Sequence, residues 1–193
     1  MSEKDHYRPT ADEISQEITA GKRRRTFFRT LRSTAFAMLS VAAVAILIAT
    51  QLLPTLRIFG SSMSPTLEEG EIVVAVKTSK FKTGDIAAFY YNNKLLVKRV
   101  ICGPGEWFNL QEDGTVYVNG IRLEEPYLTE KHMGSCDLEL PYQVPEQQYF
   151  MIGDDRESSV DSRLKQVGCI PEEQIVGKIF FRIWPLSAFG KVS

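Results

Sequence analysis

Histidine is scarce in this sequence, and its scarcity narrows the chemistry that the chain can carry. Only two residues are histidine, His6 and His132. A serine nucleophile needs a base to accept its proton, and histidine is the usual one. His6 lies in a polar N-terminal stretch and His132 in a segment of mixed polarity, so a Ser-His-Asp triad has little support. Lysine is the other option for a base, provided that burial lowers its pKa enough to leave it neutral.

The chain also lacks an excess of charge and is poor in cysteine. Its formal net charge of -1 gives no sign of a nucleic-acid partner, which usually requires a basic excess on one domain. Three cysteines, Cys102, Cys136 and Cys169, leave at least one thiol unpaired within the chain, and their spacing does not show whether any two pair. His132 and Cys136 fit no familiar zinc-ligand spacing. We therefore expect surface residues here, with no metal and no cofactor.

Charge is absent altogether from one long segment, Ser33 to Leu56. About 20 helical residues cross a bilayer core about 30 Å thick, so this segment is long enough to span it. The alternative is the apolar region of a cleaved signal peptide, since Ala43 and Ala45 place small residues at alternate positions. Such a region has about 7–15 residues and does not follow a long polar tail. We therefore predict an uncleaved transmembrane anchor at residues 33–56.

The charges on either side of this segment predict its orientation. Lys22 to Arg32 contains six cations and no acid, whereas acidic residues follow the segment at Glu68, Glu69 and Glu71. Lys and Arg mark the cytoplasmic side of a membrane span. We predict a single-pass protein of the cell membrane, with residues 1–32 as a basic cytoplasmic tail and residues 57–193 as an extracytoplasmic domain.

Beyond the anchor the sequence has the pattern of short β-strands. Apolar runs at Glu71–Lys77, Asp85–Tyr91 and Lys94–Ile101 are bounded by turn residues, and Asn119-Gly120 separates two further runs as a hairpin signal. The predicted fold class is mostly β, an antiparallel β-sheet domain preceded by one N-terminal transmembrane helix. The segment Glu125–Glu146, with three prolines, is expected to be a mobile insertion of unassigned role.

One lysine meets the requirement for a buried base. In a strand, Leu96, Lys98 and Val100 share one face, which surrounds this lysine with apolar neighbours. The alternative is an edge strand whose Lys98 and Arg99 extend into water along their alkyl stems. Taken alone, the strand favours this second interpretation, because lysine is seldom fully buried.

Four short motifs that follow the anchor change this balance. They are Ser62-Met63-Ser64-Pro65-Thr66-Leu67, Gly84-Asp85-Ile86, Lys98-Arg99-Val100 and the stretch GDDRESSVDSR from Gly153 to Arg163. In this order, with the closing GKIFFRIWP at residues 177–185, they resemble the motif series of the type I signal peptidases, the bacterial leader peptidases. The resemblance is to the compact single-anchor form and covers roughly residues 57–185 together with the anchor.

The resemblance implies a membrane-anchored serine endopeptidase that removes signal peptides from exported preproteins at the outer face of the membrane. Its partners are such preproteins and the lipid bilayer, and its oligomeric state stays open. In this family a Ser–Lys dyad is catalytic, and the residues that match it are Ser62 and Lys98. The backbone N–H of Ser62 is expected to face the oxyanion. Ser159 matches the serine that orients the lysine, and Asp161 and Arg163 match a structural ion pair.

Two positions depart from the family pattern. Gly60 stands where some members have a serine that assists the oxyanion hole, so the second donor is unidentified. Cys102 stands where the family more often has a small residue.

The family cleaves after small residues, which implies shallow apolar pockets beside an extended peptide. Ile58, Phe59 and the strand Asp85–Tyr91 are the residues expected to wall these pockets.

Two other classes of protein remain as alternatives. A self-cleaving repressor protease also uses a Ser–Lys pair, but such proteins are cytosolic and carry a DNA-binding domain. A membrane-anchored β module that only binds a partner would explain the anchor and the strands. It would not explain why Ser62, Lys98 and Ser159 all occur in their expected motifs.

Overall fold

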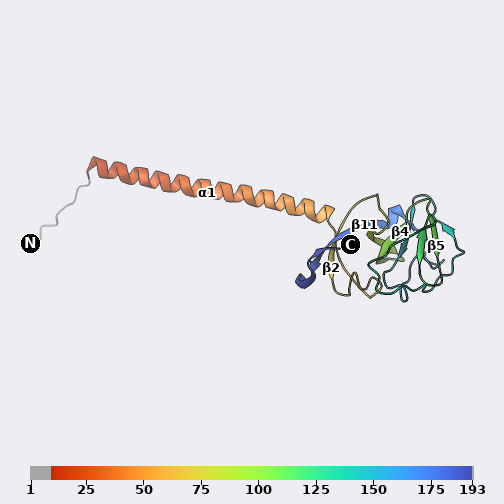
Figure 1. Ribbon diagram of the computed structural model, residues 1–193. Helices are drawn as coiled ribbons and strands as arrows, with labels where there is room; N and C mark the ends of the chain where they lie inside the picture. Colours follow the sequence, from red (N-terminus) through yellow and green to blue (C-terminus); the bar gives the residue numbers. More distant parts are fainter. Residues whose placement is uncertain (1–9, 193) are drawn as a thin grey trace, which may run out of the picture. The chain divides into compact units, whose positions relative to one another are not determined.

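The computed structural model describes residues 10–192, with the surroundings of side chains 13–25 and 48–52 left undescribed. The chain divides into two compact units, one ending at Thr50 and the other beginning at Gln51. The described part of the first unit is helical from Ala11 onward, and the strands belong to the second unit (Figure 1).

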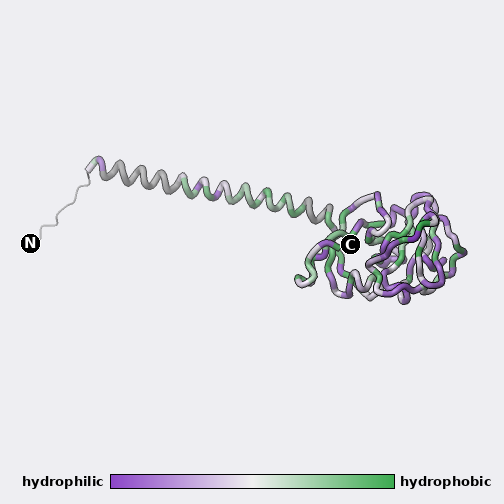
Figure 2. Tube along the Cα trace, in the orientation of Figure 1, coloured by the Kyte–Doolittle hydropathy of each residue, from purple (hydrophilic) through white to green (hydrophobic). Residues whose placement is uncertain are grey.

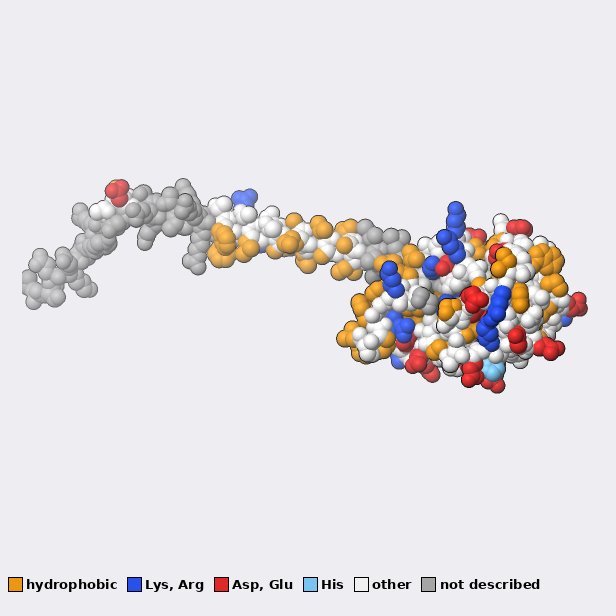
Figure 3. Space-filling model, viewed as in Figure 1, with side chains coloured by type: hydrophobic (Ala, Val, Ile, Leu, Met, Phe, Trp, Pro, Cys, Tyr) orange, Lys and Arg blue, Asp and Glu red, His pale blue; other side chains and the backbone are white. Residues whose placement is uncertain are grey.

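Helix α1 (Ala11–Leu52) is one uninterrupted helix of 42 residues. Within it, Thr26–Leu47 has a mean hydropathy of 1.7 and none of it is buried, so by length and composition it is able to cross a membrane. The described part of its second half is mostly green in Figure 2, and orange hydrophobic side chains lie among white ones along the same stretch in Figure 3.

The helix ends four residues before the predicted end of the anchor. Pro54 disfavours helical geometry in the residue before it and supplies no backbone N–H. Its carbonyl instead accepts a hydrogen bond from the backbone N–H of Ala75 at 2.9 Å. The last residues of the uncharged segment, up to Leu56, therefore enter the sheet as part of strand β1 (Thr55–Arg57).

The second unit consists of two antiparallel sheets. The larger sheet has the order β1-β2-β11-β3-β4-β9-β10, with β12 paired to β11, and the smaller has the order β7-β6-β5-β8. The remaining strands are β2 (Ile72–Val76), β3 (Ile86–Tyr91), β4 (Lys94–Cys102), β5 (Trp107–Leu110), β6 (Val116–Val118), β7 (Ile121–Arg122), β8 (Tyr142–Gln143), β9 (Gln148–Ile152), β10 (Ile170–Pro171), β11 (Ile175–Trp184) and β12 (Gly190–Lys191). Two short 3₁₀ helices occur at Glu172–Gln174 and Leu186–Ala188. The predicted mostly β, antiparallel fold with one N-terminal apolar helix is confirmed.

Asparagine-rich turns set the register of two hairpins. Asn119 and Gly120, between β6 and β7, have φ angles of 53° and 79°, and Asn92 and Asn93, between β3 and β4, have 46° and 60°. Two consecutive residues with positive φ give the tight turn whose twist matches that of paired strands. The second hairpin is the one that places Lys98 opposite Ala87.

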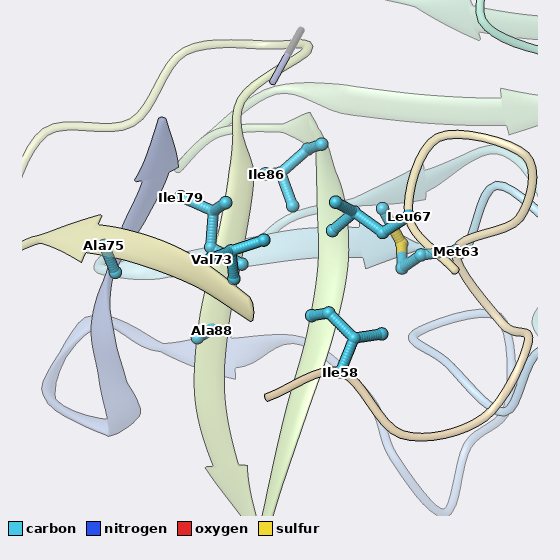
Figure 4. Packing of buried hydrophobic residues seen from close by; sticks show 8 residues of the cluster. All are labelled: Ile58, Met63, Leu67, Val73, Ala75, Ile86, Ala88 and Ile179. Carbon is cyan, nitrogen blue, oxygen red and sulfur yellow. The ribbon is translucent and has the colours of Figure 1, made fainter. Parts of the chain in front are cut away.

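Three clusters of buried apolar residues form the core of the second unit. One joins β2, β3 and β11 to the segment after β1 and is shown in Figure 4. It includes Ile58, Met63 and Leu67, so the chain around Ser62 is packed into the core on both sides. The other two clusters lie around Phe108 and Phe150 and around Phe89 and Met151.

Cys102 lies in the core, and the other two cysteines are partly buried. Of the two residues expected at the surface, His132 is exposed, whereas Cys136 is partly buried. Cys102 is fully buried, and Cys136 and Cys169 pack against the same apolar cluster. All three are unpaired. Burial raises the pKa of Cys169 to about 11 and also raises that of Cys102. These two thiols therefore stay protonated and behave as small apolar side chains.

Candidate active site

The segment that carries Ser62 is a compact turn held by its neighbours. Gly60 has a φ of 77°, a conformation that favours glycine. The turn closes with hydrogen bonds from the Ser64 N–H to the Ser61 carbonyl at 2.8 Å and from the Leu67 N–H to the Met63 carbonyl at 2.9 Å. Met63 is almost fully buried, so it fixes the residue next to Ser62 while Ser62 itself stays partly exposed.

Lys98 reaches Ser62 from strand β4. Its side chain is 3% exposed, and its Nζ donates a hydrogen bond to the Ser62 Oγ at 2.6 Å. An edge-strand lysine that extends into water is therefore excluded. Because successive strand residues point to opposite faces, Lys98 and its neighbour Arg99 leave the sheet in opposite directions.

Burial changes the acidity of Lys98. Loss of hydration lowers its pKa from 10.5 to about 8. Among the nearby charges, Asp161 opposes this change most strongly and Arg163 adds to it, while Asp154 and Asp155 also favour the charged form. With a pKa of about 8, about 10% of the side chains are neutral at pH 7 and half at pH 8. Lys98 can therefore act as a base near neutral pH.

The motif loop that contains Ser159 lies against Ser62. The Asp155 N–H donates to the Ser62 carbonyl at 3.2 Å. Gly153 has no room for a side chain, because a Cβ there would lie 2.2 Å from the Ser159 Oγ and 2.4 Å from the Ser62 carbonyl oxygen. The Ser159 side chain is buried, and its hydroxyl has no hydrogen-bond partner in the described part of the chain. The structure thus brings Ser159 next to Ser62 but forms no hydrogen bond between its hydroxyl and Lys98.

Asp161 and Arg163 form a buried, bidentate ion pair. The Nε and Nη2 of Arg163 each lie 2.9 Å from a carboxylate oxygen of Asp161. Arg163 also donates to the Met133 carbonyl at 2.6 Å, and Asp161 accepts the Gly153 N–H at 3.1 Å. The pair therefore ties the Ser159 loop both to the residue that packs on Ser62 and to the distant Met133.

A second buried ion pair was not predicted from the sequence. The Nη2 of Arg99 lies 2.7 Å from the Asp154 Oδ2, and both side chains are at most 2% exposed. Thr66 donates to the same carboxylate at 2.5 Å. The signal for such a pair was present, since an arginine inside an apolar strand requires an acceptor when it is buried.

A cleft of about 520 Å³ leads to Ser62. One wall is the stretch Thr55–Gly60, which includes the buried Ile58 and the 76% exposed Phe59, and the other is Lys94–Val97 of β4. Residues of β3, expected from the sequence to form a wall, do not line this cleft. In the described structure β4 pairs with β9 only from Arg99 onward, so its edge is open along the cleft. Such an edge can pair with an extended peptide.

The remaining polar residues offer no metal site in the described part of the chain. Residues 10–192 contain no group of three or more His, Cys, Asp or Glu side chains close enough to hold an ion. His132 is exposed, and its Nε2 lies 3.1 Å from Glu130. It does not line the cleft that leads to Ser62.

Comparison with known proteins gives consistent matches. A family model described as signal peptidase, peptidase S26, matches residues 31–184. Signal peptidase IB of Staphylococcus aureus (strain COL) is 41% identical over 150 residues, which cover 67% of this chain and 77% of that protein. Signal peptidase I of Bacillus licheniformis is 34% identical over 168 residues, with coverage of 80% and 89%. A crystal structure of a signal peptidase I from Enterococcus faecalis V583 matches with a TM-score of 0.42 at 30% identity, covering 51% of this chain and 96% of that one.

Proposed function

This chain belongs to the signal peptidase family, peptidase S26, and we propose that it removes signal peptides from exported preproteins with Ser62 as nucleophile and Lys98 as general base. The observation that carries this proposal is the 2.6 Å contact between the Ser62 Oγ and a buried lysine whose pKa is lowered to about 8. A nucleophile in hydrogen-bond contact with a base is the arrangement that covalent catalysis by serine requires.

The reaction begins with the loss of a proton from Ser62. Neutral Lys98 accepts the hydroxyl proton as the Oγ attacks the scissile carbonyl, which forms a tetrahedral intermediate. The ammonium of Lys98 then returns the proton to the leaving nitrogen, and the C–N bond breaks to give an acyl-enzyme and the free amino terminus of the mature protein. Water, deprotonated by the same lysine, attacks the ester carbonyl. The bond between the acyl carbon and the Ser62 Oγ then breaks, the lysine returns the proton to this Oγ, and the signal peptide leaves with a new carboxylate.

Stabilisation of the oxyanion is assigned to the backbone N–H of Ser62. Donors aimed at the developing negative charge supply a large share of the catalysis of acyl transfer. Gly60 has no hydroxyl to act as a second donor, and its positive φ of 77° is suited to glycine. A backbone N–H or a water molecule is the remaining kind of second donor.

The peptide before the scissile bond is proposed to occupy the cleft between Thr55–Gly60 and Lys94–Val97. The open edge of β4 offers backbone groups to an extended chain, and Ile58, Phe59 and Leu95 offer apolar surface. Ser62 and Met63 line this cleft together with the two walls, so the residue before the scissile bond would lie beside these side chains. The cleft thus gives a physical reason for cleavage after small residues.

Three further residues are proposed to support the dyad. Asp161 and Arg163 hold the loop of Ser159 in place through their buried pair. The Ser159 hydroxyl, buried beside Ser62 and without a partner, is available to accept a hydrogen bond from the Lys98 ammonium once Ser62 has been acylated. That bond would hold the lysine during deacylation.

The apolar helix is proposed to anchor the enzyme in the cell membrane with its N-terminus in the cytoplasm. Six cations between Lys22 and Arg32 precede the uncharged segment, as expected for the cytoplasmic side. The domain from residue 57 onward would then work at the outer face, where the apolar part of a signal peptide also lies in the bilayer. Residues 1–9, part of the predicted tail, lie outside the described structure.

A cleavage assay tests the proposed function and separates it from that of a binding module without activity. The full chain, solubilised in detergent, is mixed with a preprotein, and the new amino terminus is sequenced. We expect a cut after the small residue that ends the signal peptide, and no cut with Ser62→Ala. No cleavage by a folded wild-type chain, or unchanged cleavage by Ser62→Ala, would refute the proposal.

A further inference from the structure

Three buried arginines near the dyad all contact one segment, residues 125–133. They are Arg99, Arg156 and Arg163, and each is at most 3% exposed. Their respective contacts in the segment are the ring of Tyr127, the carboxylate of Glu125 and the carbonyl of Met133. The sequence predicted a mobile insertion at Glu125–Glu146. In the structure its first part, residues 125–133, contacts the residues around the dyad.

On one side, the segment holds the strand that carries Lys98. Arg99, the next residue of β4, donates to both oxygens of Asp154 at 2.9 and 2.7 Å, and to a backbone carbonyl at 2.8 Å. The Tyr127 ring covers its guanidinium, with 3.7 Å from the Cζ to the ring centroid. A guanidinium that is stacked on a ring and hydrogen-bonded through all three of its nitrogens has one orientation. The Tyr127 hydroxyl in turn donates to Glu125 at 2.8 Å.

On the other side, the segment holds the loop that touches Ser62. Glu125 pairs with Arg156, and their side chains are 0% and 1% exposed. The Nε of Arg156 donates to the Gly153 carbonyl at 3.2 Å. Gly153 is the residue packed against both the Ser159 hydroxyl and the Ser62 carbonyl. One chain of contacts therefore connects the strand of the base to the loop beside the nucleophile.

We propose that Glu125 and Tyr127 are positioning residues, which set the distance between the Lys98 Nζ and the Ser62 Oγ by locking β4 and the 153–159 loop to each other. A buried ion pair adds little net stability compared with well-packed apolar residues, but it fixes one geometry. The catalytic role of Ser62 and Lys98 rests on the function proposed above. The contacts that position these two side chains are observed independently of that function.

Three substitutions in the full, detergent-solubilised chain test this proposal. Glu125→Gln removes the charge without changing the shape, and Tyr127→Leu removes the ring from Arg99. Glu124→Gln is the matched control, because Glu124 is adjacent, 83% exposed and paired only loosely with Arg122 at 3.8 Å. For the first two we expect kcat per folded molecule to fall about 10²-fold, the loss typical of a misplacement of about 1 Å. KM should change less than about 2-fold, because residues 125–133 do not line the cleft that leads to Ser62. The control should behave as the wild type.

A second measurement decides the matter without relying on activity. Amide hydrogen exchange in residues 153–163 should be faster in Glu125→Gln and Tyr127→Leu than in Glu124→Gln, because the contacts that hold this loop are lost. If the wild type cleaves no preprotein, the proposed function fails, and the exchange rates alone still test the positioning role. Exchange equal to that of the control overturns the proposal. A kcat equal to that of the wild type in folded Glu125→Gln also overturns the proposal. The same holds if total activity falls only as much as the amount of folded protein does.

Discussion

Replacing Lys98 by Met should make the domain more stable at neutral pH while abolishing its activity. Met matches lysine in length and bears no charge. Burial lowers the pKa of Lys98 from 10.5 to about 8, and each pKa unit corresponds to about 1.4 kcal/mol. Keeping the ammonium buried therefore costs about 3 kcal/mol below pH 8. Loss of the hydrogen bond to Ser62 offsets about 1 kcal/mol of this. The expected net gain in the free energy of unfolding is about 2 kcal/mol.

The pH dependence of this gain has a definite sign. Because the folded pKa of Lys98 lies below the unfolded one, the unfolded wild type binds more protons between pH 8 and 10.5, and wild-type stability rises through that window. The full cost of the buried ammonium applies below about pH 8 and disappears above about pH 10.5. Lys98→Met lacks this dependence. It should be more stable than the wild type at pH 7 and slightly less stable above pH 10.5.

Urea unfolding in detergent at several pH values measures the difference, with the fluorescence of Trp107 and Trp184 as the signal, since both tryptophans lie in the second unit. Wild-type turnover should rise with pH through about 8, as Lys98 loses its proton. Lys98→Arg is the matched control that keeps the charge, and it should fold but stay inactive at every pH, because arginine keeps its proton. A Met variant less stable than the wild type at pH 7, or a difference that does not change with pH, would refute the reasoning.

Three further outcomes are expected. Asp161→Asn leaves the buried Arg163 unpaired and should lower the free energy of unfolding by about 3–5 kcal/mol, with activity and thermal midpoint falling together; abolished activity at full stability would indicate a reacting role. His132→Ala should keep turnover close to that of the wild type, because His132 is exposed and does not line the cleft; a loss of about 10²-fold would mean that the base is misassigned. A reporter fused after residue 193 should be active only outside the cytoplasm, and cytoplasmic activity would exclude the proposed topology.

The parts of the fold that short-range patterns determine were predictable from the sequence. Alternating apolar residues and Asn-rich turns predicted the strands, and Asn119-Gly120 forms the predicted hairpin between β6 and β7. The uncharged segment predicted an apolar helix, although its end depended on Pro54, whose effect extends only to its neighbours. Each of these features is determined by residues that are close to it in the sequence.

The parts that depend on distant contacts were not predictable in the same way. Arg99 pairs with Asp154, 55 residues away, and Arg156 with Glu125, 31 residues away. Nothing in the local pattern of either partner identifies the other. Likewise, the cleft has β4 rather than β3 as its second wall, because β9 begins to pair with β4 only at Arg99. The strands can be predicted from a single sequence, but the residue at which two strands stop pairing cannot.

The buried cations near the dyad differ in their partners, and this difference explains why Lys98 can act as a base. Arg99, Arg156 and Arg163 each form an ion pair with a buried carboxylate. Lys98 is the exception. Among residues 10–192 it takes part in no ion pair, and its Nζ donates a hydrogen bond to the neutral hydroxyl of Ser62. A carboxylate in direct contact with it would have stabilised the ammonium and raised its pKa. The arginine pairs keep Asp154 and Asp161 out of direct contact with Lys98, so burial outweighs the attraction of these carboxylates and lowers the pKa of the lysine to about 8.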